Sequence, residues 1–311
     1  MGYTSYSSAD RAVRSASLGY ATITKATSDT VFKQNKLGMI HEEMKPSKAL
    51  LRESRDSGTH PNSVPIIIAL DETGSMGDIP IHMVKEGLPK MVSKTIQNGI
   101  PDPQILFLGI GDHECDIAPL QVGQFESGDA ELDLWLTRTW NERGGGANAG
   151  ESYFLAWYFA AMHTKHDCYE KRGQKGLLFT IGDEPNLKHL PSRSIEEIMG
   201  TPSQSSYSDI QLLKLAQKTY DVYHIIVNHS YTAEHSKDYW TKVLGQNCIT
   251  ISDYSKVADT ISDIVIANVN ARVLSNPVSN KPVIETDDLV DGGSITIKPT
   301  TKVKLSTEEI L

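Results

Sequence analysis

The 311-residue chain has little cysteine, no long apolar run and no excess of basic residues. Its three cysteines, Cys115, Cys168 and Cys248, form no CxxC pair, so neither a disulfide framework nor a cysteine zinc site is expected. No stretch approaches the roughly 18 apolar residues that span a bilayer, and the first residues lack a signal-peptide core. We therefore expect a cytoplasmic protein that has no membrane partner.

Charge and missing motifs exclude further classes. The chain has 30 Lys and Arg against 39 Asp and Glu, a net charge of -9. Because nucleic-acid binders neutralise phosphates with a basic excess, no nucleic-acid partner is expected. The sequence also lacks a GxxxxGK[ST] phosphate loop and a G-x-S-x-G nucleophile turn. What remains is an ordinary globular composition, with 39% hydrophobic and 22% charged residues.

The most informative stretch is VPIIIALDETGSMG, residues 64–77. Its apolar part is too short for a buried helix and rich in isoleucine, which predicts a central strand buried on both faces. Asp71, Thr73 and Ser75 follow at alternate positions, so their side chains project to one side at the strand end, where α/β sheets place their sites. One carboxylate and two hydroxyls suit a hard cation such as Mg²⁺, with Mn²⁺ or Ca²⁺ as alternatives. The competing interpretation is a plain turn in which Thr73 or Ser75 caps the next helix.

The Asp71-x-Thr73-Gly74-Ser75-Met76 sequence after a buried strand resembles the first motif of the von Willebrand factor A family. The metal-ion-dependent adhesion site of that family begins Asp-x-Ser/Thr-x-Ser. The wider chain is similar to bacterial and phage-encoded members that carry this core, a glycine-rich GES segment and a GDE segment. The resemblance implies a Rossmann-like fold and a metal site completed by two further loops.

The second loop implied by the resemblance is the glycine-rich segment 143–152. The family places a threonine there, shortly after a Gly-Gly pair, but this chain has none. The oxygen donors on offer are Asn148, Glu151 and Ser152, of which we assign Asn148 and Glu151 to the metal. Glu151 would strengthen cation binding or replace the carboxylate that a partner brings. Its alternative role is that of a first-turn acid complementing a helix dipole.

The third loop follows the predicted strand 176–181. The family ends this strand in an aspartate, whereas an ungapped match here gives Gly182, with Asp183 one position later. Because glycine makes the loop pliable, we expect Asp183 to reach the metal through a bulge.

Alternating strand and helix patterns predict an α/β fold, a doubly wound, mostly parallel sheet of about six strands flanked by helices. Residues 64–273 form this domain. Residues 1–63 carry few large aliphatic side chains and no sustained period, which predicts a partly irregular arm. Residues 274–311 are expected to form an extension with a hairpin. The polar run Asp112 to Asp116 is interpreted as a hairpin turn rather than a metal site.

Three functions follow from these patterns. The first is a non-enzymatic, Mg²⁺-dependent module whose open metal position accepts a carboxylate from a partner protein. The second is a structural or assembly subunit of a virion or of a complex with an ATPase of the MoxR type, by analogy with intracellular members of the family. The third is a Mg²⁺-dependent phosphatase or phosphotransferase, because Asp71 followed by Thr73 and Gly74 also resembles the haloacid-dehalogenase phosphatases. Those enzymes need an acidic residue at the position of Thr73 as general acid.

Overall fold

The computed structural model describes residues 6–100, 102–144, 148, 150–227 and 231–275. At its centre is a six-stranded sheet with the strand order β10-β9-β6-β2-β3-β4, in which only β4 runs antiparallel to its neighbour. This confirms the predicted fold class. The strands are β2 (Val64–Asp71), β3 (Pro103–Ile110), β4 (Leu120–Val122), β6 (Gly176–Gly182), β9 (Tyr220–Val227) and β10 (Cys248–Ile251).

The order of the strands creates a switch point between β2 and β6. From β2 the chain moves outward through β3 to β4, and it then returns to β6 on the other side of β2 before continuing to β9 and β10. In doubly wound sheets of this order, ligands bind in the crevice at the carboxyl ends of the two strands that flank the switch. Asp71 ends β2 and Asp183 follows β6, so both acids lie at this position.

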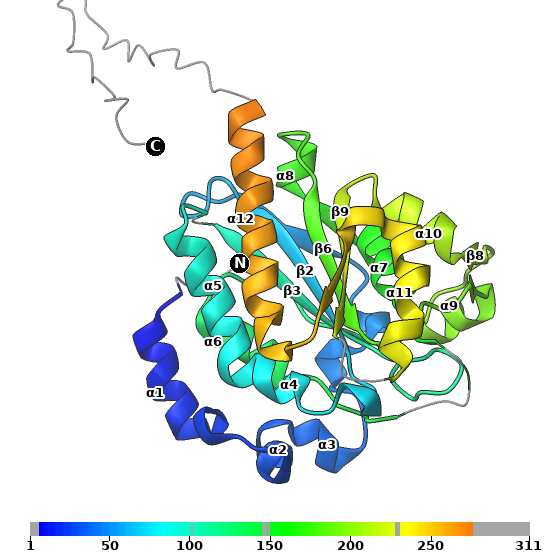
Figure 1. Cartoon of the computed structure of the whole chain (residues 1–311), viewed down its shortest axis with the longest axis horizontal. Helices are drawn as coiled ribbons and strands as arrows, with labels where there is room; N and C mark the ends of the chain where they lie inside the picture. Colours follow the sequence, from blue (N-terminus) through cyan, green and yellow to red (C-terminus); the bar gives the residue numbers. More distant parts are fainter. Residues whose placement is uncertain (1–5, 101, 145–147, 149, 228–230, 276–311) are drawn as a thin grey trace, which may run out of the picture. The chain divides into compact units, whose positions relative to one another are not determined.

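Helices cover both faces of the sheet (Figure 1). Along β2, Ile66 and Ile68 join one core cluster while Ile67 and Ala69 join the other, because successive strand side chains point to opposite faces. Helices that contribute to the first cluster are α4 (Ile79–His82), α5 (Leu88–Gln97), α6 (Asp129–Arg138) and α12 (Val257–Ser275). Helices that contribute to the second are α7 (Phe154–His163), α9 (Ser192–Met199), α10 (Asp209–Ala216) and α11 (Tyr231–Leu244).

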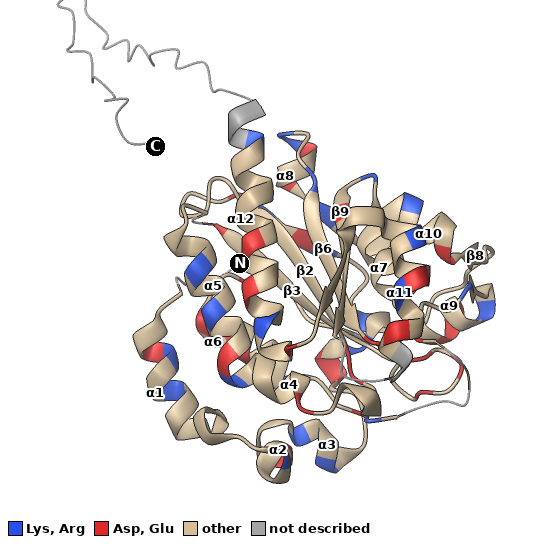
Figure 2. Cartoon of the chain, in the orientation of Figure 1, with Lys and Arg blue, Asp and Glu red and all other residues tan. Residues whose placement is uncertain are grey.

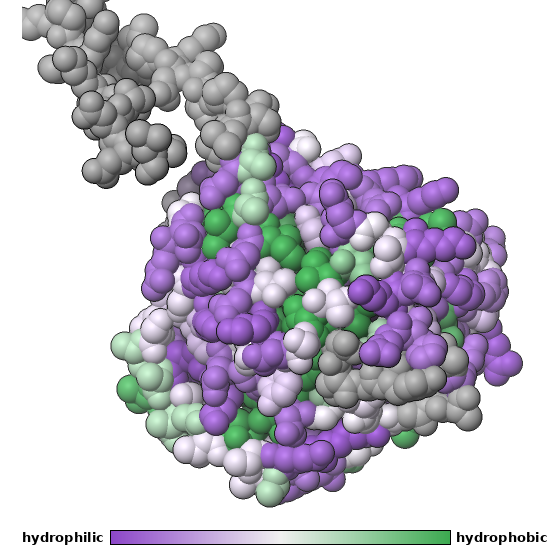
Figure 3. All heavy atoms as spheres, viewed as in Figure 1, coloured by the Kyte–Doolittle hydropathy of each residue, from purple (hydrophilic) through white to green (hydrophobic). Residues whose placement is uncertain are grey.

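The face shown in Figure 3 is mostly hydrophilic, with an apolar stripe between α12 and the neighbouring strands. The side chains of Ile251 and Ile264 are half-buried and pack against the first core cluster. In the part of the chain that the structure describes, no helix combines the length and apolar character needed to cross a membrane.

The helix predicted over residues 79–98 is interrupted. A π-helical turn, Met83–Gly87, separates α4 from α5, and Pro89 lies in the first turn of α5. Proline has no N–H to donate and clashes with the carbonyl four residues back, which a continuous α-helix cannot accommodate. The expected kink at Pro89 is therefore replaced by a wider turn just before it, where the Leu88 amide donates to the carbonyl of Met83.

The described part of residues 1–63 consists of short helices and irregular segments that pack onto the sheet domain. Short helices are present, but Tyr20 and Phe32 are buried in the first core cluster, and the segment belongs to the same compact unit as the sheet. Arg11, itself buried, donates to Asp133 of α6 at 3.0 Å and to the carbonyl of Val84 in the π-helical turn at 2.5 Å. The helices are α1 (Ser8–Leu18), α2 (Ser28–Val31) and α3 (Lys33–Leu37). Composition did not reveal this packing because it depends on contacts with residues more than 70 positions away.

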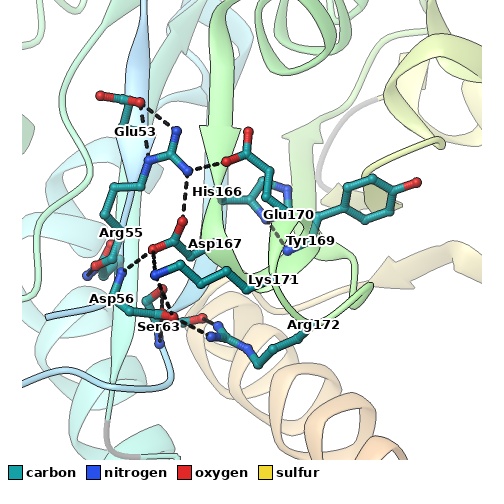
Figure 4. Close-up of polar contacts among 11 residues, drawn as sticks. Glu53, Arg55, Asp56, Ser63, His166, Asp167, Tyr169, Glu170, Lys171 and Arg172 are labelled. Atoms are coloured by element: carbon teal, nitrogen blue, oxygen red, sulfur yellow. Dashed lines mark hydrogen bonds and ion pairs between the residues drawn. The ribbon is translucent and has the colours of Figure 1, made fainter.

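Just before β2 the chain is held by an ion network (Figure 4). Strand β1 (Arg52–Ser54) pairs in parallel with β5 (Thr164–His166), and α8 (Asp167–Glu170) follows β5. Arg55 donates to Asp167 at 2.8 Å, and Arg172 donates to Asp56 at 2.6 Å. Asp56 in turn accepts from the amide and hydroxyl of Ser63. The network thus fixes the entry to the central strand.

The residues Asp112 to Asp116 form the turn between β3 and antiparallel β4, as predicted. A second short antiparallel pair joins β7 (His189–Leu190) to β8 (Tyr207–Ser208). The hairpin expected within 274–311 lies outside the described residues, apart from the last two residues of α12.

Candidate metal centre

A chain of hydrogen bonds links the loops after β2 and β6. The amide and the hydroxyl of Thr73 both donate to Asp71 Oδ1, at 2.9 and 2.5 Å. The Ser75 hydroxyl lies 3.2 Å from that of Thr73 and donates to Asp183 Oδ1 at 2.9 Å. Each hydroxyl thus turns its proton toward a buried carboxylate, so its oxygen acts as an acceptor on its other side.

The second oxygen of Asp71 is held by Tyr153. The Tyr153 hydroxyl, fully buried, donates to Asp71 Oδ2 at 2.6 Å. Burial and the nearby charge of Asp71 raise the pKa of Tyr153 well above its usual value, so the phenol keeps its proton at neutral pH. Gly182 makes this contact possible, since a Cβ at that position would lie 1.9 Å from the hydroxyl oxygen.

Beside the hydroxyls lies a small cavity of about 100 Å³, whose lining includes Thr73, Ser75, Asn148, Glu151 and Glu184. The Asn148 amide nitrogen donates to Asp112 Oδ2 at 2.6 Å and to Glu114 Oε2 at 3.0 Å. Its carbonyl oxygen is therefore the group left for a ligand. Glu151 is 6% exposed, and its Oε2 has no hydrogen-bond partner among the described residues.

Among the described residues, no Lys or Arg side chain bonds to the carboxylates of Asp71, Glu151 and Asp183 at this site. Burial raises the pKa of Asp71 and, with the charge of Asp71, that of Glu151. Asp183 is fully buried, and its Oδ2 also lacks a partner among the described residues. Figure 2 shows acidic segments recurring in the loops at the lower edge of the sheet. A buried carboxylate without a partner is unfavourable, so these residues fit a bound cation.

The candidate ligands are oxygen atoms of several kinds rather than a cluster of His, Cys, Asp and Glu side chains. Among the described residues, no group of three or more His, Cys, Asp and Glu side chains is placed to hold a metal by itself. Hydroxyl oxygens, an amide oxygen and one or two carboxylates are instead the ligands that Mg²⁺ tolerates together with water.

The structure distinguishes between the alternatives that the sequence left open. Thr73 makes no side-chain cap to the 3₁₀ turn Gly74–Met76, so its hydroxyl serves Asp71 instead. Glu151 precedes α7, whose first turn contains no acid, so the helix-dipole role does not apply. Asp183 follows β6 directly and reaches the site through Ser75. Ser152 turns away, because its hydroxyl bonds to the amide and ring of His113.

Sequence reasoning missed Tyr153 and Asp112. Tyr153 directly precedes α7, an almost wholly apolar helix, so nothing in its local sequence indicates a polar role. The signal that could have identified it is Gly182, a residue without a side chain where the family has an acid. Asp112 was assigned to a turn, which is correct, yet it also orients the Asn148 amide.

Comparisons with known proteins give structural likeness only. No family model matches the chain, and no curated protein matches its sequence. The open form of the pilus adhesin SpaC from Lactobacillus rhamnosus GG matches with 10% identity and a TM-score of 0.45, over 70% of this chain and 31% of the adhesin.

Two structures of proximal thread matrix protein 1 from the mussel byssus also match. Crystal form 2 has 10% identity and a TM-score of 0.44, over 67% of this chain and 48% of that protein. The structure described as having a zinc-occupied MIDAS motif has 11% identity and a TM-score of 0.43, over 70% and 49%. This chain thus spans about a third to a half of these proteins, and its fold class rests on the strand order and helix layers described above.

Proposed function

We propose that this chain is a von Willebrand factor A type module that binds Mg²⁺ at the switch point and, through it, an acidic group of a partner protein. Thr73, Ser75, Asn148 and Glu151 would hold the cation. Asp71 and Asp183 would supply negative charge from behind the two hydroxyls. When bound, the cation would offer an incompletely filled coordination shell, which binds carboxylates with strong dependence on orientation.

The observation that carries the proposal is the direction of the two hydroxyl groups. Thr73 donates to Asp71 and Ser75 donates to Asp183, so the protons of both hydroxyls face buried carboxylates and their oxygens act as acceptors. Both hydroxyls line the same cavity as Glu151, whose buried Oε2 has no partner in the part of the chain that the structure describes. A turn that served only to start a helix would need one such hydroxyl. That hydroxyl would accept a bond from a backbone N–H and would not need to donate to a carboxylate.

A binding role is favoured over phosphoryl transfer by the state of Asp71. A nucleophilic carboxylate must present an oxygen to its substrate. Asp71 is fully buried, Oδ1 accepts two hydrogen bonds, and Oδ2 accepts one from Tyr153. Thr73 also occupies the position where a general acid would be needed. Release of phosphate from a generic phosphate ester, lost in Asp71→Asn, would favour the enzyme instead.

The first test measures Mg²⁺ binding by titration calorimetry and by the unfolding temperature with Mg²⁺ or EDTA. At a Mg²⁺ concentration of 100 times Kd, linkage adds about 2.7 kcal/mol to the free energy of unfolding. We expect this gain in the wild type and its loss in Asp71→Asn. The matched control is Asp102→Asn, a buried aspartate that bonds to His60 and Asn62 just before β3. Equal Mg²⁺ binding by wild type and Asp71→Asn would contradict the proposal.

The second test concerns the partner's acidic group. Mn²⁺ replaces Mg²⁺ as a paramagnetic probe, and the relaxation of water protons reports on water bound to the ion. A peptide with one aspartate should displace this water, whereas the same peptide with asparagine should not. If neither peptide displaces the water, the cation site would stand but the proposal that it binds an acidic group of a partner would be wrong. Cytoplasmic location and an assembly role beside an ATPase of the MoxR type stay predictions from the sequence.

A further inference from the structure

Tyr153 is placed to control how Asp71 takes part in the site. It lies at the start of α7 on the face of the sheet that also carries Asp71, Thr180 and His224. Its hydroxyl donates to Asp71 Oδ2, whereas the Thr73 amide and hydroxyl donate to Oδ1. The carboxylate is therefore held at both oxygens by donors from two different segments.

These bonds use most of the accepting capacity of Asp71. An ionised carboxylate has about four lone-pair positions, and three are occupied by the bonds to Thr73 and Tyr153. Turning the carboxylate plane to present both oxygens toward the cavity would break the Tyr153 bond and one bond to Thr73. Asp71 can thus offer at most one lone pair while Tyr153 stays in place.

Tyr153 itself cannot move aside. It is fully buried, and its ring packs edge-on against His224 at 5.0 Å and Trp240 at 5.5 Å between centroids. Its hydroxyl occupies the space where a side chain at Gly182 would begin. His224 is further fixed by a 2.8 Å contact with Thr180 and by stacking on Trp240. The donor to Asp71 is therefore part of a rigid buried cluster.

We infer that Tyr153 is a positioning residue that makes the site selective for small divalent cations over Ca²⁺, an inference that rests on the proposed metal-binding function. Ca²⁺ takes 6–8 oxygen ligands and often binds both oxygens of one carboxylate. Mg²⁺ usually binds one or two carboxylates and keeps several water molecules. While Tyr153 holds it, Asp71 stays behind the hydroxyls and cannot turn both of its oxygens toward the ion, as the larger cation would require. Removing the clamp favours Ca²⁺.

The test compares the affinities of Mg²⁺ and Ca²⁺ by titration calorimetry in wild type, Tyr153→Phe and Tyr158→Phe. Tyr158→Phe removes a hydroxyl from the same helix without touching Asp71. The readout is the ratio of the two affinities, because any change in the protonation of Asp71 affects both cations alike. We expect the preference for Mg²⁺ over Ca²⁺ to fall about tenfold in Tyr153→Phe and to stay unchanged in Tyr158→Phe, a tenfold change being the lower end of what loss of an outer-shell partner produces.

A second variant reaches the same contact from the other side. In Gly182→Ala the new methyl group would overlap the Tyr153 hydroxyl and displace it from Asp71, so the preference should fall as in Tyr153→Phe. If the wild type binds Mg²⁺ but the ratio is unchanged in both folded variants, the inference is wrong and the proposed function stands. If the wild type binds neither cation, the proposed function fails and this inference fails with it.

Discussion

The Ser75 hydroxyl donates a 2.9 Å hydrogen bond to Asp183 across a separation of 108 residues. This bond joins the strand-end loops on the two sides of the switch point. In the proposed site, this bond would let an aspartate one position late contribute its charge through a hydroxyl. An acid that acts through another group tolerates a shift that a direct ligand would not.

We expect Asp183→Asn to bind Mg²⁺ 10- to 100-fold more weakly than the wild type, as for other outer-shell partners. Asparagine keeps the size of the side chain and an oxygen for Ser75, so the fold should persist. Titration calorimetry measures the affinity, with Asp102→Asn as the matched control. An affinity equal to that of the wild type would show that Asp183 only orders the loop.

Glu151→Gln should change stability in opposite directions with and without the cation. Replacing a buried, unpaired carboxylate by an amide is expected to raise the free energy of unfolding in EDTA by about 1 kcal/mol. The same change removes a charged ligand, so the stabilisation by Mg²⁺ should shrink. Thermal unfolding in EDTA and in Mg²⁺ gives both values. A variant less stable in EDTA, with an unaltered Mg²⁺ effect, would place Glu151 outside the site.

Asp133→Ala tests the docking of the N-terminal segment. Asp133 accepts from Arg11, Arg14 and Tyr20, and its removal leaves the buried Arg11 guanidinium without its carboxylate. Breaking a buried pair in this way costs about 3–5 kcal/mol. Urea unfolding measures the loss. The control is Arg193→Ala, which breaks an exposed pair with Glu197 and should produce no measurable change. A similarly small effect for both variants would mean that α1 adds little to the fold.

Acid should destabilise the fold in two steps around α8. Burial lowers the pKa of His166 to about 4, so between pH 6.5 and 4 the unfolded chain takes up this proton first and stability falls as pH falls. The loss reaches about 3 kcal/mol at pH 4. Burial raises the pKa of Asp167, but hydrogen bonds from Lys171, the Asp56 amide and Arg55 outweigh it and lower the pKa. Asp167 therefore adds a further loss of stability as the pH falls below its unfolded pKa of 3.8.

His166→Asn separates the two steps. Asparagine is a good helix N-cap and can accept from the Tyr169 amide as His166 does, but it does not titrate. Urea unfolding at pH 7, 5.5 and 4 should show a shallower loss in this variant. Parallel pH profiles for wild type and variant would mean that His166 does not drive the first step.

The sequence predicted the sheet well because each strand carries its own signal. Val64–Leu70 and Gly176–Ile181 are short apolar runs bounded by polar or glycine residues, and both became central strands. The hydrogen-bonded loop after β2 was predictable for the same reason, since Asp71, Thr73 and Ser75 are close in sequence.

What the sequence could not give depends on contacts between distant residues. The role of Tyr153 needs the bare backbone of Gly182, 29 positions later, and that of Arg11 needs Asp133, 122 positions away. The π-helical turn results from Pro89 within a helix whose periodicity is otherwise unbroken. Local pattern and composition contain none of these relationships.

The strand order also determines when each edge of β2 can pair during translation. Strand β2 can pair with β3 as soon as Ile110 is made, but its other edge must wait for β6, which begins at Gly176, 66 positions later. At typical rates of chain elongation this takes roughly 3–13 s. During that interval one edge of an almost wholly apolar strand has no neighbour, and unpaired strand edges promote association between chains. Slower translation between residues 110 and 176 should therefore lower the soluble yield of this protein.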